Sequence, residues 1–167
     1  LSQTSITDFD VIEKFDTLNQ IKRTQNSKSA FVTIQEGCDK FCHFCVVPYT
    51  RGSEYSRTVY EIEDEVKSLV DLGVVEFTLL GQNVNAFHGS DASGQSHSLA
   101  SLIDTVSQIN GVERITYSTS HPVNMTDDLI ELHGTNHKLM PFLHLPVQSG
   151  SDKILKLMNR KHTRDYY

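Results

Sequence analysis

The chain has 167 residues, of which 38% are hydrophobic and 22% are charged, values typical of a globular domain with a core of its own. With 15 Lys and Arg against 21 Asp and Glu, the net charge is -6, which excludes a generally basic surface for nucleic acid but not a local basic patch. The sequence shows no apolar run of about 18 residues and no signal-peptide pattern at its start, so we expect a cytoplasmic protein that contacts no membrane.

Residues 1–29 are polar and keep no hydrophobic period for long, so we interpret them as a linker that enters from an upstream domain. The core domain is expected to span residues 30–167 and to be incomplete at its C-terminal end. Within it, strands are predicted over residues 30–34, 76–80, 114–118 and 142–145. Helical patterns begin after the candidate N-caps Thr58, Thr126 and Ser151 and at Leu99, and Glu61 completes a capping box with Thr58.

Strands that alternate with helices of this length indicate an α/β fold with a parallel sheet. About four βα units are predicted, too few to close an eight-stranded barrel, so we expect an open or partial barrel. Polar residues gather directly after each predicted strand, in residues 36–45, 82–85, 118–121 and 148–151. Because the carboxyl ends of parallel strands share one edge, these four clusters are expected to meet there.

The strongest signal is the Cys-x3-Cys-x2-Cys spacing of Cys38, Cys42 and Cys45, which directly follows the first predicted strand. Three thiolates in one loop suit three corners of an iron–sulfur cubane and leave its fourth iron open for chemistry. Gly37 permits a tight turn around such a body. A tetrahedral zinc site with His43 as fourth ligand is the alternative. A redox pair of Cys42 and Cys45 would leave Cys38 unexplained.

This spacing, with the aromatic Phe44 before the last cysteine, resembles the signature of the radical S-adenosylmethionine (SAM) superfamily. The resemblance implies a partial (β/α)6 barrel, cut short here after about four βα units, and a 4Fe-4S cluster on Cys38, Cys42 and Cys45. It further implies that SAM chelates the open iron and is cleaved to a 5'-deoxyadenosyl radical, with Phe44 packed on its adenine. In such enzymes the cofactors supply the radical chemistry, and the protein binds and positions them.

Four further runs resemble the methylthiotransferases of this superfamily, and most of all the MiaB type: VVPYTRG (46–52), LLGQNVN (79–85), TSHP (119–122) and HLPVQSGS (144–151). That type adds a methylthio group to an isopentenylated adenosine beside the anticodon of tRNA. The resemblance implies tRNA and a reducing electron donor as partners, and a second 4Fe-4S cluster on an N-terminal domain. The alternatives are a methylthiotransferase for threonylcarbamoyl-adenosine or for a ribosomal protein, and a non-catalytic zinc- or RNA-binding module.

The remaining candidate residues lie near the expected sheet edge. Candidates for SAM binding are Gln82, Asn83, Ser118 and Gln148. Arg51 and Arg57 are candidates for contacts with tRNA phosphate or with the SAM carboxylate, with pairing to Glu54 as the structural alternative. We interpret His121, which precedes a proline, as a structural loop residue. Five cations against Asp152 and Asp165 form either a solvated face or an RNA-facing stripe after Gly150: Lys153, Lys156, Arg160, Lys161 and Arg164.

Overall fold

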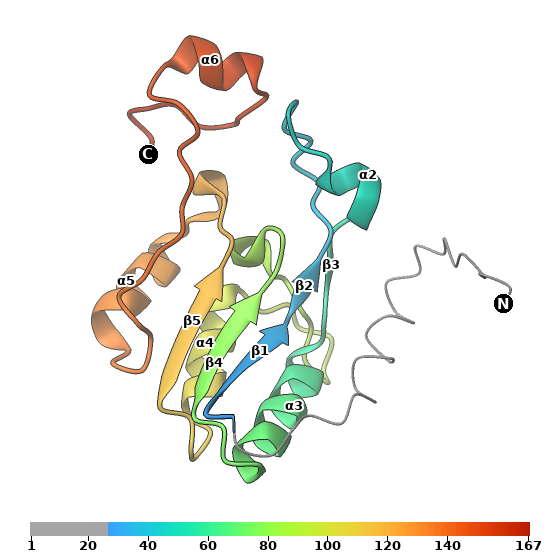
Figure 1. Ribbon diagram of the computed structural model, residues 1–167, viewed down its shortest axis with the longest axis vertical. Helices are drawn as coiled ribbons and strands as arrows, with labels where there is room; N and C mark the ends of the chain where they lie inside the picture. Colours follow the sequence, from blue (N-terminus) through green and yellow to red (C-terminus); the bar gives the residue numbers. More distant parts are fainter. Residues whose placement is uncertain (1–26) are drawn as a thin grey trace, which may run out of the picture.

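The computed structural model describes residues 27–167, so most of the predicted linker over residues 1–29 lies outside the described part. The described chain contains a three-stranded parallel sheet in the order β1-β4-β5 (Figure 1). Its strands are β1 (Ser29–Thr33), β4 (Glu76–Leu80) and β5 (Arg114–Ser118), so the first three predicted strands are confirmed to within a residue. The expected α/β class with a parallel sheet is likewise confirmed.

Helices α3 (Val59–Asp71) and α4 (Leu99–Ser107) connect these strands. Thr58 closes the predicted capping box at the start of α3, where its side chain accepts from the Glu61 N–H and the Glu61 carboxylate accepts from the Thr58 N–H. Helix α5 (Asp127–Thr135) begins after Thr126, as predicted, and continues through Gly134.

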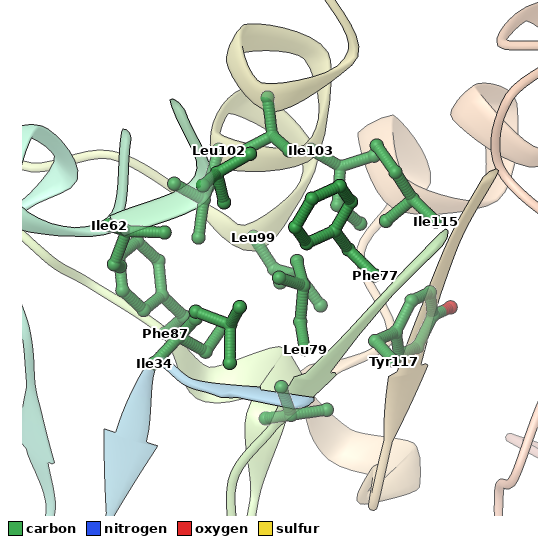
Figure 2. Close-up of a cluster of buried hydrophobic side chains, with 14 of the residues drawn as sticks. Ile34, Ile62, Phe77, Leu79, Phe87, Leu99, Leu102, Ile103, Ile115 and Tyr117 are labelled. Atoms are coloured by element: carbon green, nitrogen blue, oxygen red, sulfur yellow. The ribbon is translucent and has the colours of Figure 1, made fainter. Parts of the chain in front are cut away.

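The core lies between the sheet and these helices (Figure 2). Alternate strand residues such as Phe77, Leu79 and Ile115 are buried against Leu102 and Ile103 of α4, as the two-residue period of a strand requires. The residues between them face away from the helices and are polar in part. Thr78 and Thr116, for example, share a hydrogen bond of 2.8 Å between their hydroxyls. The sheet therefore has one apolar covered face and one more polar face.

The prediction of a fourth strand over residues 142–145 is wrong. Pairing with β5 is limited to one parallel bridge between Ile115 and Leu139. Continuing this ladder would require the Phe142 N–H to bond to β5, but it bonds to the Met140 carbonyl instead, at 2.7 Å. The resulting three-residue turn is centred on Pro141, whose ring fixes φ near the value that such turns need. The described part thus contains three strands in parallel rather than the four βα units expected.

Short elements at the carboxyl edge of the sheet escaped prediction because they are too short to show a period. Strand β2 (Gln35–Glu36) pairs in antiparallel fashion with β3 (Tyr55–Ser56). Between them lies the short helix α2 (Val47–Arg51). Two 3-10 turns, η1 (Val84–Ala86) and η2 (Pro122–Asn124), follow β4 and β5. The last helix, α6 (Asp152–Leu157), follows Ser151 as predicted. Within residues 27–167, no helix is long and apolar enough to cross a membrane.

Candidate metal centre at the carboxyl edge of the sheet

Residues 37–46, which we call the cysteine loop, leave the sheet edge after β2 and lead into α2 (Figure 1). The loop begins at Gly37, which has a φ of +76°. A Cβ at this position would overlap with the carbonyl oxygen of Ser53, so only glycine fits. The Gly37 N–H donates to Gln82 Oε1 at 2.7 Å, and its carbonyl accepts from Gln35 Nε2 at 2.8 Å. The start of the loop is therefore fixed to the ends of two strands.

The three cysteines are free thiols that differ in burial. Cys42 is buried, whereas Cys38 and Cys45 are half-buried. Burial raises the pKa of the Cys38 thiol, and the nearby Glu54 and Cys42 add to the shift, while Lys40 and a backbone hydrogen bond oppose it. Because a cysteine binds a metal as its thiolate, binding of a metal group here has to displace a proton from Cys38.

Residues 157–160, which we call the α6 strap, lie against the tip of the cysteine loop. The His43 N–H donates to the Met158 carbonyl at 3.0 Å, and His43 Nδ1 lies 2.7 Å from the Leu157 carbonyl. Asn159 Nδ2 donates to the Phe41 carbonyl at 2.8 Å, and Arg160 Nη1 donates to Cys42 Sγ at 3.5 Å. Three consecutive residues of the cysteine loop thus contact four consecutive residues of the α6 strap, which follow them in the chain by more than a hundred positions.

The donor set fits an iron–sulfur cubane better than a single ion. Within residues 27–167, no group of three His, Cys, Asp or Glu side chains converges closely enough to hold one metal ion. A cubane places each cysteine sulfur on a different iron, so its ligands do not need to converge on one point. His43, the fourth ligand of the zinc alternative, uses Nδ1 for the Leu157 carbonyl. Three free thiols, a glycine turn and a cationic donor beside one sulfur therefore suit a cluster.

Two predicted SAM ligands, Gln82 and Asn83, lie at this edge but have structural partners. Gln82 bonds to Gly37, as described above. Asn83 is buried, and its Nδ2 donates to Asn124 Oδ1 at 3.3 Å. Its Oδ1 is buried without a hydrogen-bond partner, so it keeps one acceptor for a ligand.

The two other predicted SAM ligands, Ser118 and Gln148, lie in different environments. Ser118 lies at the end of β5, with its Oγ 3.4 Å from Nδ1 of His144. Gln148 is exposed and has a φ of +71°. Phe44, which is predicted to pack on the adenine, is 54% exposed on the cysteine loop and is therefore accessible to a ligand.

The two arginines proposed for RNA contacts differ sharply. Arg51 is exposed and pairs with Glu36 at 3.3 Å, not with Glu54. Arg57 is buried, donates to the Thr33 carbonyl at 2.8 Å and pairs with Glu65 at 2.6 Å. Its guanidinium joins β1 to α3, which contradicts the expected contact with RNA phosphate, because a buried cation with these partners cannot reach a phosphate without losing them.

Two buried histidines lie beside the strap. The rings of His121 and His162 meet edge to face with centroids 5.9 Å apart. Burial lowers the pKa of His121 to about 3, and the charges of Arg160, Lys40 and His162 add to this shift. Burial also lowers the pKa of His162, again with a contribution from Arg160. Both rings are therefore neutral near pH 7, and His121 serves as the N-cap of η2, in line with its structural interpretation.

Sequence reasoning missed Gln35, and it treated Arg160 only as part of a basic stripe. Gln35 is fully buried and links Gly37 to Asn83, whose N–H donates to Gln35 Oε1 at 3.2 Å. A polar residue inside the β-rich run before the cysteines was the available signal for Gln35. No local signal marks Arg160, because its contact with Cys42 spans 118 positions.

A parallel sheet whose carboxyl edge holds three cysteines in this spacing defines a class of enzyme domain, and a family model agrees. The model of the radical SAM superfamily matches residues 32–167, so the chain belongs to the radical SAM superfamily. The particular relatives are tRNA-2-methylthio-N(6)-dimethylallyladenosine synthases. The protein of that name from Roseobacter denitrificans is 60% identical over 96% of this chain, and that from Rickettsia felis is 59% identical over 96%. The chain spans 36% of the length of each.

Solved structures support the fold. The radical SAM methyltransferase TsrM from Kitasatospora setae, solved with tryptophan and a SAM analogue, aligns over 83% of this chain and 26% of its own, with a TM-score of 0.63 and 13% identity. The cobalamin-dependent radical SAM enzyme OxsB aligns over 81% of this chain and 20% of its own, with a TM-score of 0.59 and 15% identity. At such identities the likeness concerns the fold alone.

Proposed function

We propose that this chain is the radical SAM domain of a tRNA methylthiotransferase, which introduces sulfur and a methyl group at an isopentenylated adenosine next to the anticodon. The observation that supports this proposal most directly is the 60% identity, over 96% of the chain, to a synthase named for that product. Because the chain spans 36% of that relative, the activity is proposed for a protein that contains this chain. The relatives' names favour this substrate over threonylcarbamoyl-adenosine or a ribosomal protein.

We propose that Cys38, Cys42 and Cys45 hold a 4Fe-4S cluster and that SAM completes its coordination. The bound cluster and SAM would supply reductive cleavage of SAM, which needs one electron from a low-potential donor. The chain's own residues then have separable tasks. Gly37 sets the direction of the loop, Gln82 fixes it to β4, and the exposed ring of Phe44 offers a stacking face to adenine.

The methylthio group also needs a sulfur source, for which residues 27–167 contain no further cysteine. We therefore assign sulfur delivery to a second 4Fe-4S cluster on a preceding domain. For tRNA, Arg51 is the better phosphate contact of the two predicted arginines, because its side chain is 56% exposed. Both tRNA and a reducing electron donor are available in the cytoplasm, which is the compartment we propose.

The proposal is tested in a bacterial strain whose own isopentenyl-adenosine methylthiotransferase gene is deleted. A full-length protein containing this chain is expected to restore the methylthiolated nucleoside, measured by mass spectrometry of tRNA digests. The Cys38→Ala variant is expected to restore none, because a cluster with two protein ligands is not retained. Restoration of a methylthiolated threonylcarbamoyl nucleoside instead would assign the other tRNA substrate. Full activity of Cys38→Ala would exclude the cluster assignment.

A further inference from the structure

The cysteine that sits deepest in the loop is also the one that a cation touches. Cys42 is 8% exposed, and Arg160 Nη1 donates to its sulfur at 3.5 Å. The second terminal nitrogen of the same guanidinium donates to the Pro146 carbonyl at 3.0 Å. The planar fork of arginine makes both contacts at once, which a single ammonium cannot do. Arg160 therefore connects the cysteine loop to the segment that precedes α6.

The surroundings of Arg160 increase the effect of its charge on the Cys42 sulfur. Its Nε is buried without a hydrogen-bond partner, and two buried histidines with lowered pKa values lie nearby. These rings are neutral near pH 7, so the charge beside Cys42 is that of the guanidinium and not of an imidazolium. In a site of low effective dielectric, a charge beside a sulfur acts more strongly than it would in water.

The backbone places Arg160 independently of its side-chain contacts. The Arg160 N–H donates to the Leu155 carbonyl at 2.9 Å at the end of α6, and Asn159 adopts a φ of +58° just before it. The three other strap contacts, from Leu157, Met158 and Asn159, hold the same stretch of chain on Phe41 and His43. The guanidinium is thus delivered to Cys42 by a strap that is already anchored.

We infer that Arg160 is a positioning residue for the cluster, which seats Cys42 in the loop and raises the reduction potential of the bound cluster. The inference rests on the proposed function, because it takes the three cysteines as cluster ligands. Hydrogen bonds to ligand sulfurs and nearby net charge set cluster potentials. The reduced cluster carries one more negative charge than the oxidised cluster, so a cation at Cys42 favours reduction. The other four basic residues of the predicted stripe have no contact of this kind with the loop.

The test uses a full-length protein that contains this chain, reconstituted anaerobically with iron and sulfide. The cluster of interest is the one whose electron paramagnetic resonance spectrum changes on addition of SAM. In Arg160→Gln, the equilibrium constant for one-electron reduction of this cluster is expected to fall about tenfold, which corresponds to a midpoint lowered by about 59 mV. The matched control is Arg164→Gln, an exposed arginine whose side chain bonds to Asp165, and its midpoint should equal that of the wild type.

An unchanged midpoint in Arg160→Gln with full iron content would overturn the inference, as would an equal shift in Arg164→Gln. If Arg160→Gln binds no iron, Arg160→Lys decides. Iron retained in the lysine variant supports a cation at Cys42, whereas loss in both variants means that position 160 serves only the fold. The midpoint does not depend on tRNA. If the wild-type protein fails to modify tRNA but Arg160→Gln still lowers the midpoint, the proposed tRNA activity is refuted and this inference stands.

Discussion

At the scale of single residues, Gly37 shows how backbone conformation and close packing act together. Its positive φ of +76° already disfavours any side chain, and the Ser53 carbonyl occupies the space that a Cβ would need. Its N–H and carbonyl also make the two hydrogen bonds that hold the loop to Gln82 and Gln35. A change here therefore moves the whole cysteine loop rather than one side chain.

The first prediction is that Gly37→Ala prevents loading of the cluster. The left-handed backbone costs about 1–2 kcal/mol for alanine, and the overlap with Ser53 adds to that cost by displacing the loop. Iron bound per chain after reconstitution measures the effect. The matched control is Gly94→Ala, which has a φ of +85° but open space around its Cβ and lies in the loop before α4. That variant should bind iron normally, and equal iron binding by Gly37→Ala would show that the loop tolerates the overlap.

The second prediction concerns the buried imidazole of His121, whose pKa is lowered to about 3 by burial and by nearby cations. An unfolded histidine takes up a proton near pH 6.5, whereas the folded one remains neutral until about pH 3. The cluster-free folded state should therefore lose stability as the pH falls from 6.5 toward 3, because the unfolded state binds more protons.

Nuclear magnetic resonance of ring-labelled histidines checks this, with the signal of His121 identified by its absence in His121→Asn. The expected result is a ring that shows no protonation at pH 5. Asparagine keeps an acceptor for the cap of η2 and removes the titrating group, so acid should destabilise that variant less. Protonation of His121 with a midpoint near 6.5 would show that the ring is solvated rather than buried.

At the scale of elements, the boundaries of α3 follow from local chemistry. Thr58 and Glu61 satisfy two backbone N–H groups reciprocally, at 3.4 Å and 2.9 Å. The helix ends before Gly73, which has a φ of +89°. Between these ends, Ile62, Val66 and Leu69 form the buried face. Such short-range signals explain why this helix is predictable from the sequence.

The third prediction is that Thr58→Ala weakens the first turn of α3 by about 1 kcal/mol, the usual cost of losing a side-chain cap. Amide exchange in that turn, measured by mass spectrometry, should then speed up about fivefold. Ser151→Ala provides the comparison, because Ser151 is the N-cap residue of α6 but forms no side-chain capping bond there. In each variant, exchange is compared in the first turn of the helix that the changed residue precedes. Equal acceleration of exchange in the two helices would mean that the capping bond of Thr58 contributes nothing to the stability of α3.

At the scale of the whole molecule, the described sheet is covered by helices on one face only. Parallel sheets are usually covered on both faces, and in a barrel the second face lines the interior. Phe31 on β1, at an edge of the three-stranded sheet, is 67% exposed. The chain also spans 36% of the length of its Roseobacter denitrificans relative. Its three cysteines are enough to bind one cluster.

The fourth prediction is that the 167-residue chain alone forms no methylthiolated nucleoside and is poorly soluble. Its ligand set supports SAM cleavage but no sulfur delivery, and its net charge of -6 provides no strong attraction to tRNA. The assay supplies SAM, reductant and isopentenylated tRNA to the anaerobically reconstituted chain, with the full-length protein as the positive control. Product above the no-enzyme level would show that the rest of the protein is dispensable for the reaction.

The sequence by itself determined the local elements and the candidate ligands. Three strands, the cap at Thr58 and the spacing of Cys38, Cys42 and Cys45 all depend on residues close together in the chain. Such signals are carried by hydrophobic period, capping chemistry and ligand spacing. The prediction of a fourth strand over residues 142–145 failed although three of its four residues are apolar, because a turn at Pro141 diverts the chain after a single bridge to β5.

Only the tertiary structure decided which polar side chains reach the cysteine loop. Arg57, a candidate for contact with tRNA phosphate, is buried between β1 and α3, whereas Arg160, grouped with the basic stripe after Gly150, donates to Cys42. Gln35 on β2 and Gln82, which follows the end of β4, both hold Gly37. Apart from the short-range bond of Gln35 to Gly37, these contacts join residues that lie far apart in the chain. Their partners are set by how the sheet and α6 pack, and hydrophobic period and motif spacing carry no information about that packing.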